Sequence, residues 1–438
     1  MLALQIEPED HRRVWAIAWP MILTGLSTPL LGMVDTAVMG HLPDPYFLGA
    51  VAVGATIINF IFWTFGFLRM GTTGITAQAH GGENGTEMRA VLARALLLAI
   101  GFAAVILLFQ APLAWLAYEL FDAGADVERE SLVYYNIRVW GAPAALANYV
   151  LWGWFLGMQN ARATLCVMLT VNGLNIVLDI VFVVGLGFDA AGVAIASVIA
   201  EFSGTALGAG LVVLELRKYP GQWDLEKITN MSRLRHMMHV NQNILIRTLC
   251  LLFAFSFFMA QSARHGEVIL AVNAVLQNFV TFMAFGLDGF AHAAEALVGK
   301  AVGARDRAAL KRCLRATCFW SGCTAVIFTL VYLFAGGLIV DLLTDLPAVR
   351  AAAVAFTPWV VASPLISVWA FWLDGVFIGM TRAVEMRNTM LISLLLIYLP
   401  AWYLLQPWGN HGLWAALLLF MAARGVTMFV VLRRIGRT

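Results

Sequence analysis

Two carboxylates interrupt stretches of the chain that are otherwise apolar. Asp35 lies in PLLGMVDTAVMGHL (29–42), and Asp179 lies in TVNGLNIVLDIVFVVGLGF (170–188). An ionisable side chain in hydrocarbon is costly and is usually functional where it occurs. Burial disfavours the charged form of a carboxyl group, and a second carboxylate nearby disfavours it further. Such a pair titrates as a unit, so it could hold one proton and exchange it for a cation.

Neutral polar side chains accompany these acids. Asn175 precedes Asp179 by four residues, which puts both on one face of a helix. Ser197 follows in the next apolar stretch, and Asn172 lies one turn before Asn175. The amides and the hydroxyl would supply hydrogen bonds to the acids, or act only as hydrogen-bond links between helices. Should the coupling ion be Na⁺ rather than H⁺, the oxygen ligands would come from Asp35, Asn175, Asp179 and Ser197.

The composition identifies the elements that must hold these residues as membrane helices. The chain has 438 residues, of which 61% are hydrophobic and 12% charged, against about 25% charged in soluble proteins. A spanning helix needs roughly 20 apolar residues, whereas the strands of a membrane β-barrel are about ten residues long and alternate in polarity. The sequence therefore predicts an all-α polytopic membrane protein with spans at 14–40, 48–78, 89–113, 131–158, 162–187, 190–215, 240–262, 268–299, 308–335, 351–380, 386–405 and 411–432.

The basic residues predict the orientation of the chain. With the N-terminus inside, only Arg129, Arg264 and Arg350 of the 28 Lys and Arg residues fall on the outer side. The positive-inside rule therefore puts both termini in the cytoplasm. The basic loops at 215–236 and 299–315 are interpreted as this topology signal rather than as sites for nucleic acid or lipid head groups. The first apolar segment is too long for a signal peptide and is expected to be retained.

This orientation brings the polar residues to one depth. Asp35 lies about six residues before its helix leaves the membrane, roughly 9 Å below the outer surface. Asp179 lies at a similar depth in the fifth span, and Ser197 lies near the outer start of the sixth. We therefore expect these side chains to converge on one level of the first half.

An internal repeat divides the chain in two. At an offset of 222 residues, LWGWFLGMQNA (151–161) matches LDGVFIGMTRA (373–383) at six of eleven positions, and AQAHGG (77–82) matches GKAVGA (299–304). Each half holds six spans, so both halves have the same orientation, which is a parallel repeat known in secondary transporters. The predicted lobes are 1–215 with the ion site, an inter-lobe loop at 216–239, and 240–438.

The second half lacks a copy of the acidic site. The repeat aligns Asp179 with Ala401 and Asn175 with Ile397. Other acids occur there, and they would either line the substrate cleft or serve structure; they are Asp288, Glu295 and Asp374. Asn172 of the first half is a further candidate for lining the cleft. The arginines within spans are expected to extend along their stems towards the membrane surface; they are Arg69, Arg138, Arg247 and Arg424.

Five ordered motifs carry a resemblance to a known family. They are LSTPLLGMVDTAVMGHL, FGFLRMGTTGITAQAHGG, GWFLGMQNARATL, VNGLNIVLDIVFV and LDGFAHAAEALVGKAVGARD. Together they resemble the multidrug and toxic compound extrusion (MATE) transporters, specifically the DinF-like branch, over essentially the whole chain. The resemblance implies two six-helix lobes around a V-shaped central cleft, and efflux of organic cations in exchange for H⁺ or Na⁺.

The resemblance also assigns roles to single residues. It matches the family's helix-1 aspartate to Asp35, its helix-5 pair to Asn175 and Asp179, and its helix-6 hydroxyl to Ser197. A proline in the helix interior removes a backbone hydrogen bond and permits a kink, and Pro20 matches the family's helix-1 hinge. Relatives carry a tyrosine one turn before the helix-1 aspartate, a position that is leucine in this chain.

These observations predict a proton-coupled multidrug antiporter that works by alternating access. Its expected partners are small organic cations or amphiphiles and the lipid bilayer, with no nucleic acid and no cofactor beyond the coupling ion. We expect a monomer in the cytoplasmic (inner) membrane of a bacterium. A flippase for lipid-linked oligosaccharide or lipid, from the same superfamily, is the alternative. An enzyme is not expected, because the sequence has no H-E-x-x-H motif, no pair of His ligands and no Cys pair.

Overall fold

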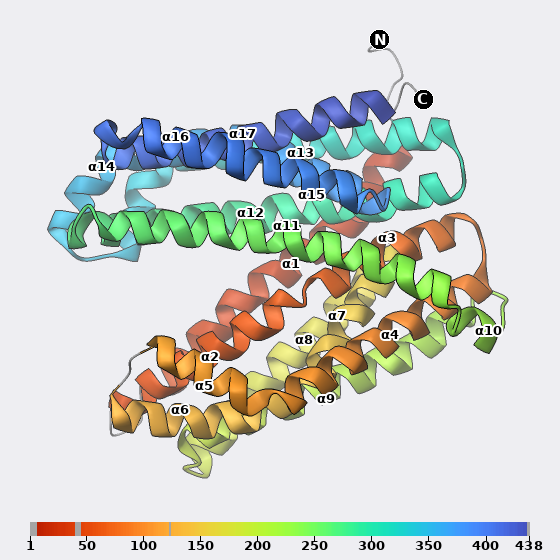
Figure 1. The fold of residues 1–438 in the computed structure, drawn as a ribbon, viewed down its shortest axis with the longest axis horizontal. Coiled ribbons are helices and arrows are strands. Elements are labelled where there is room, and N and C mark those ends of the chain that lie inside the picture. Colours follow the sequence, from red (N-terminus) through yellow and green to blue (C-terminus); the bar gives the residue numbers. More distant parts are fainter. Residues whose placement is uncertain (1–6, 40–44, 122–123, 436–438) are drawn as a thin grey trace. The chain divides into compact units, whose positions relative to one another are not determined.

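The computed structural model describes residues 7–39, 45–121 and 124–435, with side chains outside 28–48, 120–123 and 125–126. The described residues form helices and the turns between them, with no strand among them. Figure 1 shows the helices in chain order. They are α1 (Pro8–Met39), α2 (Pro45–Thr64), α3 (Phe67–Gly81), α4 (Gly85–Leu108), α5 (Gln110–Phe121), α6 (Ala125–Arg138), η1 (Val139–Gly141), α7 (Ala142–Gly157), α8 (Ala161–Asp179), η2 (Ile180–Gly185), α9 (Asp189–Leu216), α10 (Leu225–Ile228), α11 (Met231–Ala263), α12 (Glu267–Gly303), α13 (Arg307–Leu343), α14 (Pro347–Gly379), α15 (Ala383–Ile392), η3 (Ser393–Tyr398), α16 (Leu399–Leu404), η4 (Gln406–Trp408) and α17 (Asn410–Ile435).

The helices account for the predicted spans. Ten helical segments of the described chain are long and apolar enough to cross a membrane, and each overlaps one predicted span. The first predicted span lies in α1, whose last part has undescribed side chains. The fourth corresponds to α6, η1 and α7, which follow one another between Ala125 and Gly157. The predicted all-helical fold with twelve spans in two six-helix lobes is therefore confirmed.

Two compact units make up the chain. The N-unit is Leu23–Met238, and the C-unit combines Met1–Ile22 with His239–Thr438. Two helices, α1 and α11, thus contribute one segment to each unit. The predicted lobes differ from these units at the start of α1, because that segment packs in the C-unit. The Trp15 ring lies edge-on to Phe290 at 5.3 Å and to Trp320 at 5.1 Å between centroids.

The predicted inter-lobe loop at 216–239 is largely helical. It contains α10, and α11 begins within it. Asp224 caps α10 by accepting a hydrogen bond from the Lys227 amide at 3.2 Å, and Asn230 accepts one from the Arg233 amide at 3.1 Å. Asp and Asn are favoured at such positions, because their side chains satisfy amides in the first helical turn.

The repeat predicted from sequence is present in the geometry of each unit. A Cβ at Gly157 would lie 2.7 Å from the Thr73 carbonyl oxygen, and one at Gly379 would lie 2.6 Å from the Glu295 carbonyl oxygen. The two glycines and the two carbonyl groups are each 222 residues apart. Left-handed backbone repeats at the same offset, at Glu83 and Arg305, at Gln159 and Thr381, and at Gly187 and Gly409. Glycine is therefore required where α7 crosses α3 and where α14 crosses α12.

Adding a methyl group at either crossing is expected to destabilise its unit. Gly157→Ala or Gly379→Ala should lower the free energy of unfolding by about 1–3 kcal/mol, the usual cost of overpacking. Gly101→Ala and Gly322→Ala are matched controls, because a Cβ at either site meets nothing within 4 Å. Thermal unfolding in detergent measures the difference. Equal melting temperatures for crossing and control variants would contradict the proposed close packing.

Candidate ion-coupling site

A buried polar cluster lies in the N-unit, between α8 and α9. Asp179 is the last residue of α8 and is 0% exposed, and Asn175 is 3% exposed. The Asn175 amide nitrogen donates to Asp179 Oδ2 at 3.0 Å. From α9, the Ser197 hydroxyl donates to Asn175 Oδ1 over a longer distance of 3.5 Å. The structure therefore brings together three of the four side chains that were predicted to form the site.

The fourth predicted residue, Asp35, lies in α1, and its side chain is outside the described residues. An earlier turn of α1 nevertheless contacts α8, because the Asn172 amide donates a hydrogen bond to the Ser27 hydroxyl at 2.9 Å. The first and fifth predicted spans run in the same direction. Asp35 follows Ser27 by eight residues and Asp179 follows Asn172 by seven, so at about 1.5 Å per residue the two backbones are at similar levels. This register agrees with a shared site.

The backbone changes its winding directly after Asp179. Residues Ile180–Gly185 form a π-helical segment, η2, before the chain turns at Gly187. Short π-helical segments within α-helices are rare and occur frequently at functional sites. Here the segment ends the regular helix at the carboxylate, so Asp179 lies at a point where the backbone departs from α-helical geometry.

A second polar network lies deeper along α9 and was not predicted. Glu201 and Thr205 continue the face of Ser197 at four-residue intervals. Arg138 Nη2 donates to Glu201 Oε1 at 3.2 Å, and the Asn148 amide donates to Glu201 Oε2 at 2.8 Å. The Arg138 side chain is 10% exposed. The expectation that Arg138 extends to the membrane surface is wrong, because its charge is satisfied by an acid within the unit.

The C-unit holds a buried group of three charges. Asp374 Oδ2 on α14 accepts hydrogen bonds from Arg247 on α11 and from Arg424 on α17, the latter at 2.6 Å. All three side chains are buried, with Arg424 only 2% exposed. These two arginines also do not extend to the surface as expected. Asp374 was predicted either to line the cleft or to serve structure, and two guanidinium groups compensate its charge.

The other two acids of this half lie on α12. Asp288 is half-buried and close enough to Arg424 to interact with its charge. Glu295 is 2% exposed, and its Oε1 lies 3.2 Å from His292 Nδ1. The two acids, seven residues apart on α12, therefore lie beside different basic residues. Their predicted role as cleft-lining residues stays a prediction.

Pro20, the predicted hinge, is buried in α1, and the helix continues through it from Pro8 to Met39. The chain passes from the C-unit to the N-unit between Ile22 and Leu23, two residues later. Proline weakens a helix by removing one backbone hydrogen bond. The weakened turn is therefore adjacent to the point where α1 leaves one unit for the other.

Comparison of the sequence with known proteins identifies the family. The family model described as MatE matches residues 20–181 and 244–404, once in each half. DNA damage-inducible protein F of Escherichia coli (strain K12) is 43% identical over 97% of this chain and 92% of its own. A probable multidrug resistance protein NorM of Rhizobium meliloti (strain 1021) is 26% identical over 98% of this chain and 95% of its own.

Solved structures agree with the fold. MATE in the bent conformation gives a TM-score of 0.89 at 17% identity, covering 97% of this chain and 95% of that one. MATE in the straight conformation gives 0.87 at 18% identity, covering 97% and 96%. Repeated halves of membrane helices and a buried carboxyl group within the spans are features of secondary transporters. The chain is a member of the MatE family, as the sequence motifs implied, and is a transporter rather than an enzyme.

Proposed function

We propose that the protein is a multidrug efflux antiporter that exports cationic or amphipathic organic compounds in exchange for H⁺, with Na⁺ as the alternative coupling ion. The observation that carries this proposal is the environment of Asp179. The carboxyl group is fully buried, and its Oδ2 accepts a hydrogen bond from the Asn175 amide. Burial disfavours an uncompensated charge on a carboxyl group, so a proton and another cation can compete to neutralise it.

The coupling step is competition for negative charge. Protons from the outer side neutralise Asp35 and Asp179, and a bound organic cation then loses its counter-charge and leaves. Asn175 and Ser197 hold the carboxyl group in place through both protonation states. Helix α1 bends at Pro20 as the acids change charge, and the protons leave to the cytoplasm when the transporter changes its access. Support for the hinge comes from the position of Pro20 beside the unit boundary.

The coupling ion can be determined in vesicles that contain the purified protein. In sodium-free buffer, an imposed pH gradient is expected to drive export of a fluorescent organic cation at the full rate, and a sodium gradient alone should drive none. Asp35→Asn should remove this export. Export that requires sodium at every pH would assign Na⁺ as the coupling ion, and undiminished export by Asp35→Asn would reject the role of that acid.

The flippase alternative has weaker support. An anionic lipid pyrophosphate would require cationic groups that are free to bind it. The buried arginines Arg247 and Arg424 both bind Asp374. We further propose that the protein is a monomer in the inner membrane of a bacterium with both termini in the cytoplasm, on the basis of the basic loops and the bacterial relatives.

A further inference from the structure

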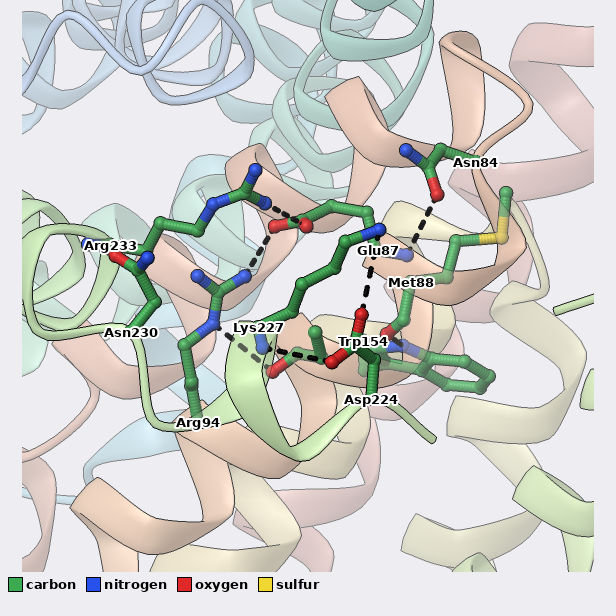
Figure 2. Close-up of polar contacts among 10 residues, drawn as sticks. Asn84, Glu87, Met88, Arg94, Trp154, Asp224, Lys227, Asn230 and Arg233 are labelled. Atoms are coloured by element: carbon green, nitrogen blue, oxygen red, sulfur yellow. Dashed lines mark hydrogen bonds and ion pairs between the residues drawn. The ribbon is translucent and has the colours of Figure 1, made fainter. Parts of the chain in front are cut away.

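An ion cluster holds the start of α11 against α4 within the N-unit. Glu87, in the first turn of α4, forms ion pairs with both Arg94 and Arg233. Figure 2 shows the two guanidinium groups on either side of this one carboxylate. Arg94 is almost fully covered, with a side chain 3% exposed, while that of Arg233 is 46% exposed. Two arginines for one acid leave the cluster with a net positive charge.

A cavity of about 380 Å³ opens beside this cluster. Its charged wall is formed by Glu87, Arg94 and Arg233, with His236 next to them. Ile75 and Met237 add apolar surface, and Met237 is 1% exposed. Ile75 and Arg94 lie close to the inner ends of the second and third predicted spans. The cavity is thus at the predicted boundary between the lipid and the cytoplasm.

Exposed apolar side chains lie on the neighbouring segment 216–231, called the linker below. Trp223 is 56% exposed, Leu225 is 75% exposed and Met231 is 57% exposed. The linker is fixed on α4, because Arg89 Nη2 donates to the Leu216 carbonyl at 2.9 Å and to the Tyr219 carbonyl at 3.0 Å. Tryptophan is enriched where membrane proteins meet the head-group region. These apolar side chains are therefore held where they would contact water unless lipid covers them.

We propose that this cavity binds the head group of an anionic phospholipid of the cytoplasmic leaflet, so that the basic segment 215–236 binds lipid in addition to its predicted role in topology. The phosphate would accept hydrogen bonds from Arg233 and Arg94, whose guanidinium groups carry more donors than Glu87 can satisfy. The acyl chains would lie towards Ile75, with Trp223 and Leu225 in the same leaflet. Basic pockets on the cytoplasmic side of membrane helices are suited to such head groups. The inference is independent of the transported compound and of the coupling ion.

Native mass spectrometry of the purified full-length protein with phosphatidylglycerol and phosphatidylcholine tests the proposal. The wild type should retain phosphatidylglycerol preferentially. Removing one positive charge with Arg233→Gln should weaken retention about fivefold, and Arg233→Lys should restore it. Glu87→Gln removes the acid that competes with the phosphate, so retention should increase. Lys311→Gln changes an exposed basic residue of α13 that does not line the cavity; it is the control and should match the wild type.

Two results would overturn the proposal. The first is equal lipid retention by Arg233→Gln, Lys311→Gln and the wild type. The second is stabilisation by inorganic phosphate alone that equals that of phosphatidylglycerol and is lost in Arg233→Gln, which would assign the cavity to a free anion. Thermal unfolding without added lipid shows whether Glu87→Gln folds. If it does not fold, the comparison of Arg233→Gln with Arg233→Lys tests the proposal.

Discussion

Asp179→Asn is expected to reduce ion-driven export to the level of vesicles without protein. The substitution keeps the shape of the side chain, and the new amide oxygen can still accept the hydrogen bond that Asn175 now donates at 3.0 Å. What disappears is the group that changes its charge, and with it the competition between proton and substrate. Folding should be retained, because a neutral side chain is easier to bury than an ionised one. Export of an organic cation under an imposed pH gradient is the measurement.

A matched control separates coupling from general loss of charge. Asp345→Asn removes a carboxylate that is fully exposed and pairs with Arg350 at 2.9 Å. Its export should equal that of the wild type. Downhill exchange of labelled for unlabelled substrate adds a second measurement, because it needs binding and access but no ion gradient. Export by Asp179→Asn at the wild-type rate would remove Asp179 from the proposed mechanism.

Features that depend on local sequence were predictable. The repeat was visible because glycines are needed where helices approach closely, and the same glycines recur in both halves at Gly157 and Gly379. The spacing of Asn175 and Asp179 fixed their common face, since residues four apart lie on one side of a helix. The side-chain cluster with Ser197 followed from depth alone, because depth can be counted along each span.

Contacts between helices were harder to predict. A helix that is apolar on nearly all sides carries no pattern that shows which side faces a neighbour. The pairing of Arg138 with Glu201 was therefore not predicted, and neither was the contact between Asn172 and Ser27. The inter-lobe segment was interpreted as a loop from its charge, although the capping residues Asp224 and Asn230 were a signal for helix starts.

Depth could have revealed the charged group of the C-unit as well. Asp374, Arg247 and Arg424 each lie roughly 9–12 Å from the inner end of their predicted spans, at about 1.5 Å per residue. Opposite charges at one depth of a membrane protein usually pair with each other. Comparing the depths of all charged residues, and not of the acids alone, would have predicted this group.

Asp374→Ala is expected to destabilise the protein by about 3–5 kcal/mol, the usual cost of leaving buried charges without a partner. Arg247 and Arg424 would then lie close together without the carboxylate that pairs with both of them. Asp374→Asn should cost less, because its amide oxygen still accepts one hydrogen bond. Thermal unfolding of the purified protein in detergent measures both variants.

A triple substitution decides whether Asp374 serves structure or transport. Replacing the whole group by apolar residues, as Arg247→Met, Asp374→Leu and Arg424→Met, removes its three charges together, and similar replacements in other proteins are often neutral or stabilising. If the group is structural, the triple variant should recover most of the stability that Asp374→Ala loses and should still export the organic cation. A triple variant that is stable but does not export would show that this group of three charges takes part in transport, because stability and activity would then have separated at the group.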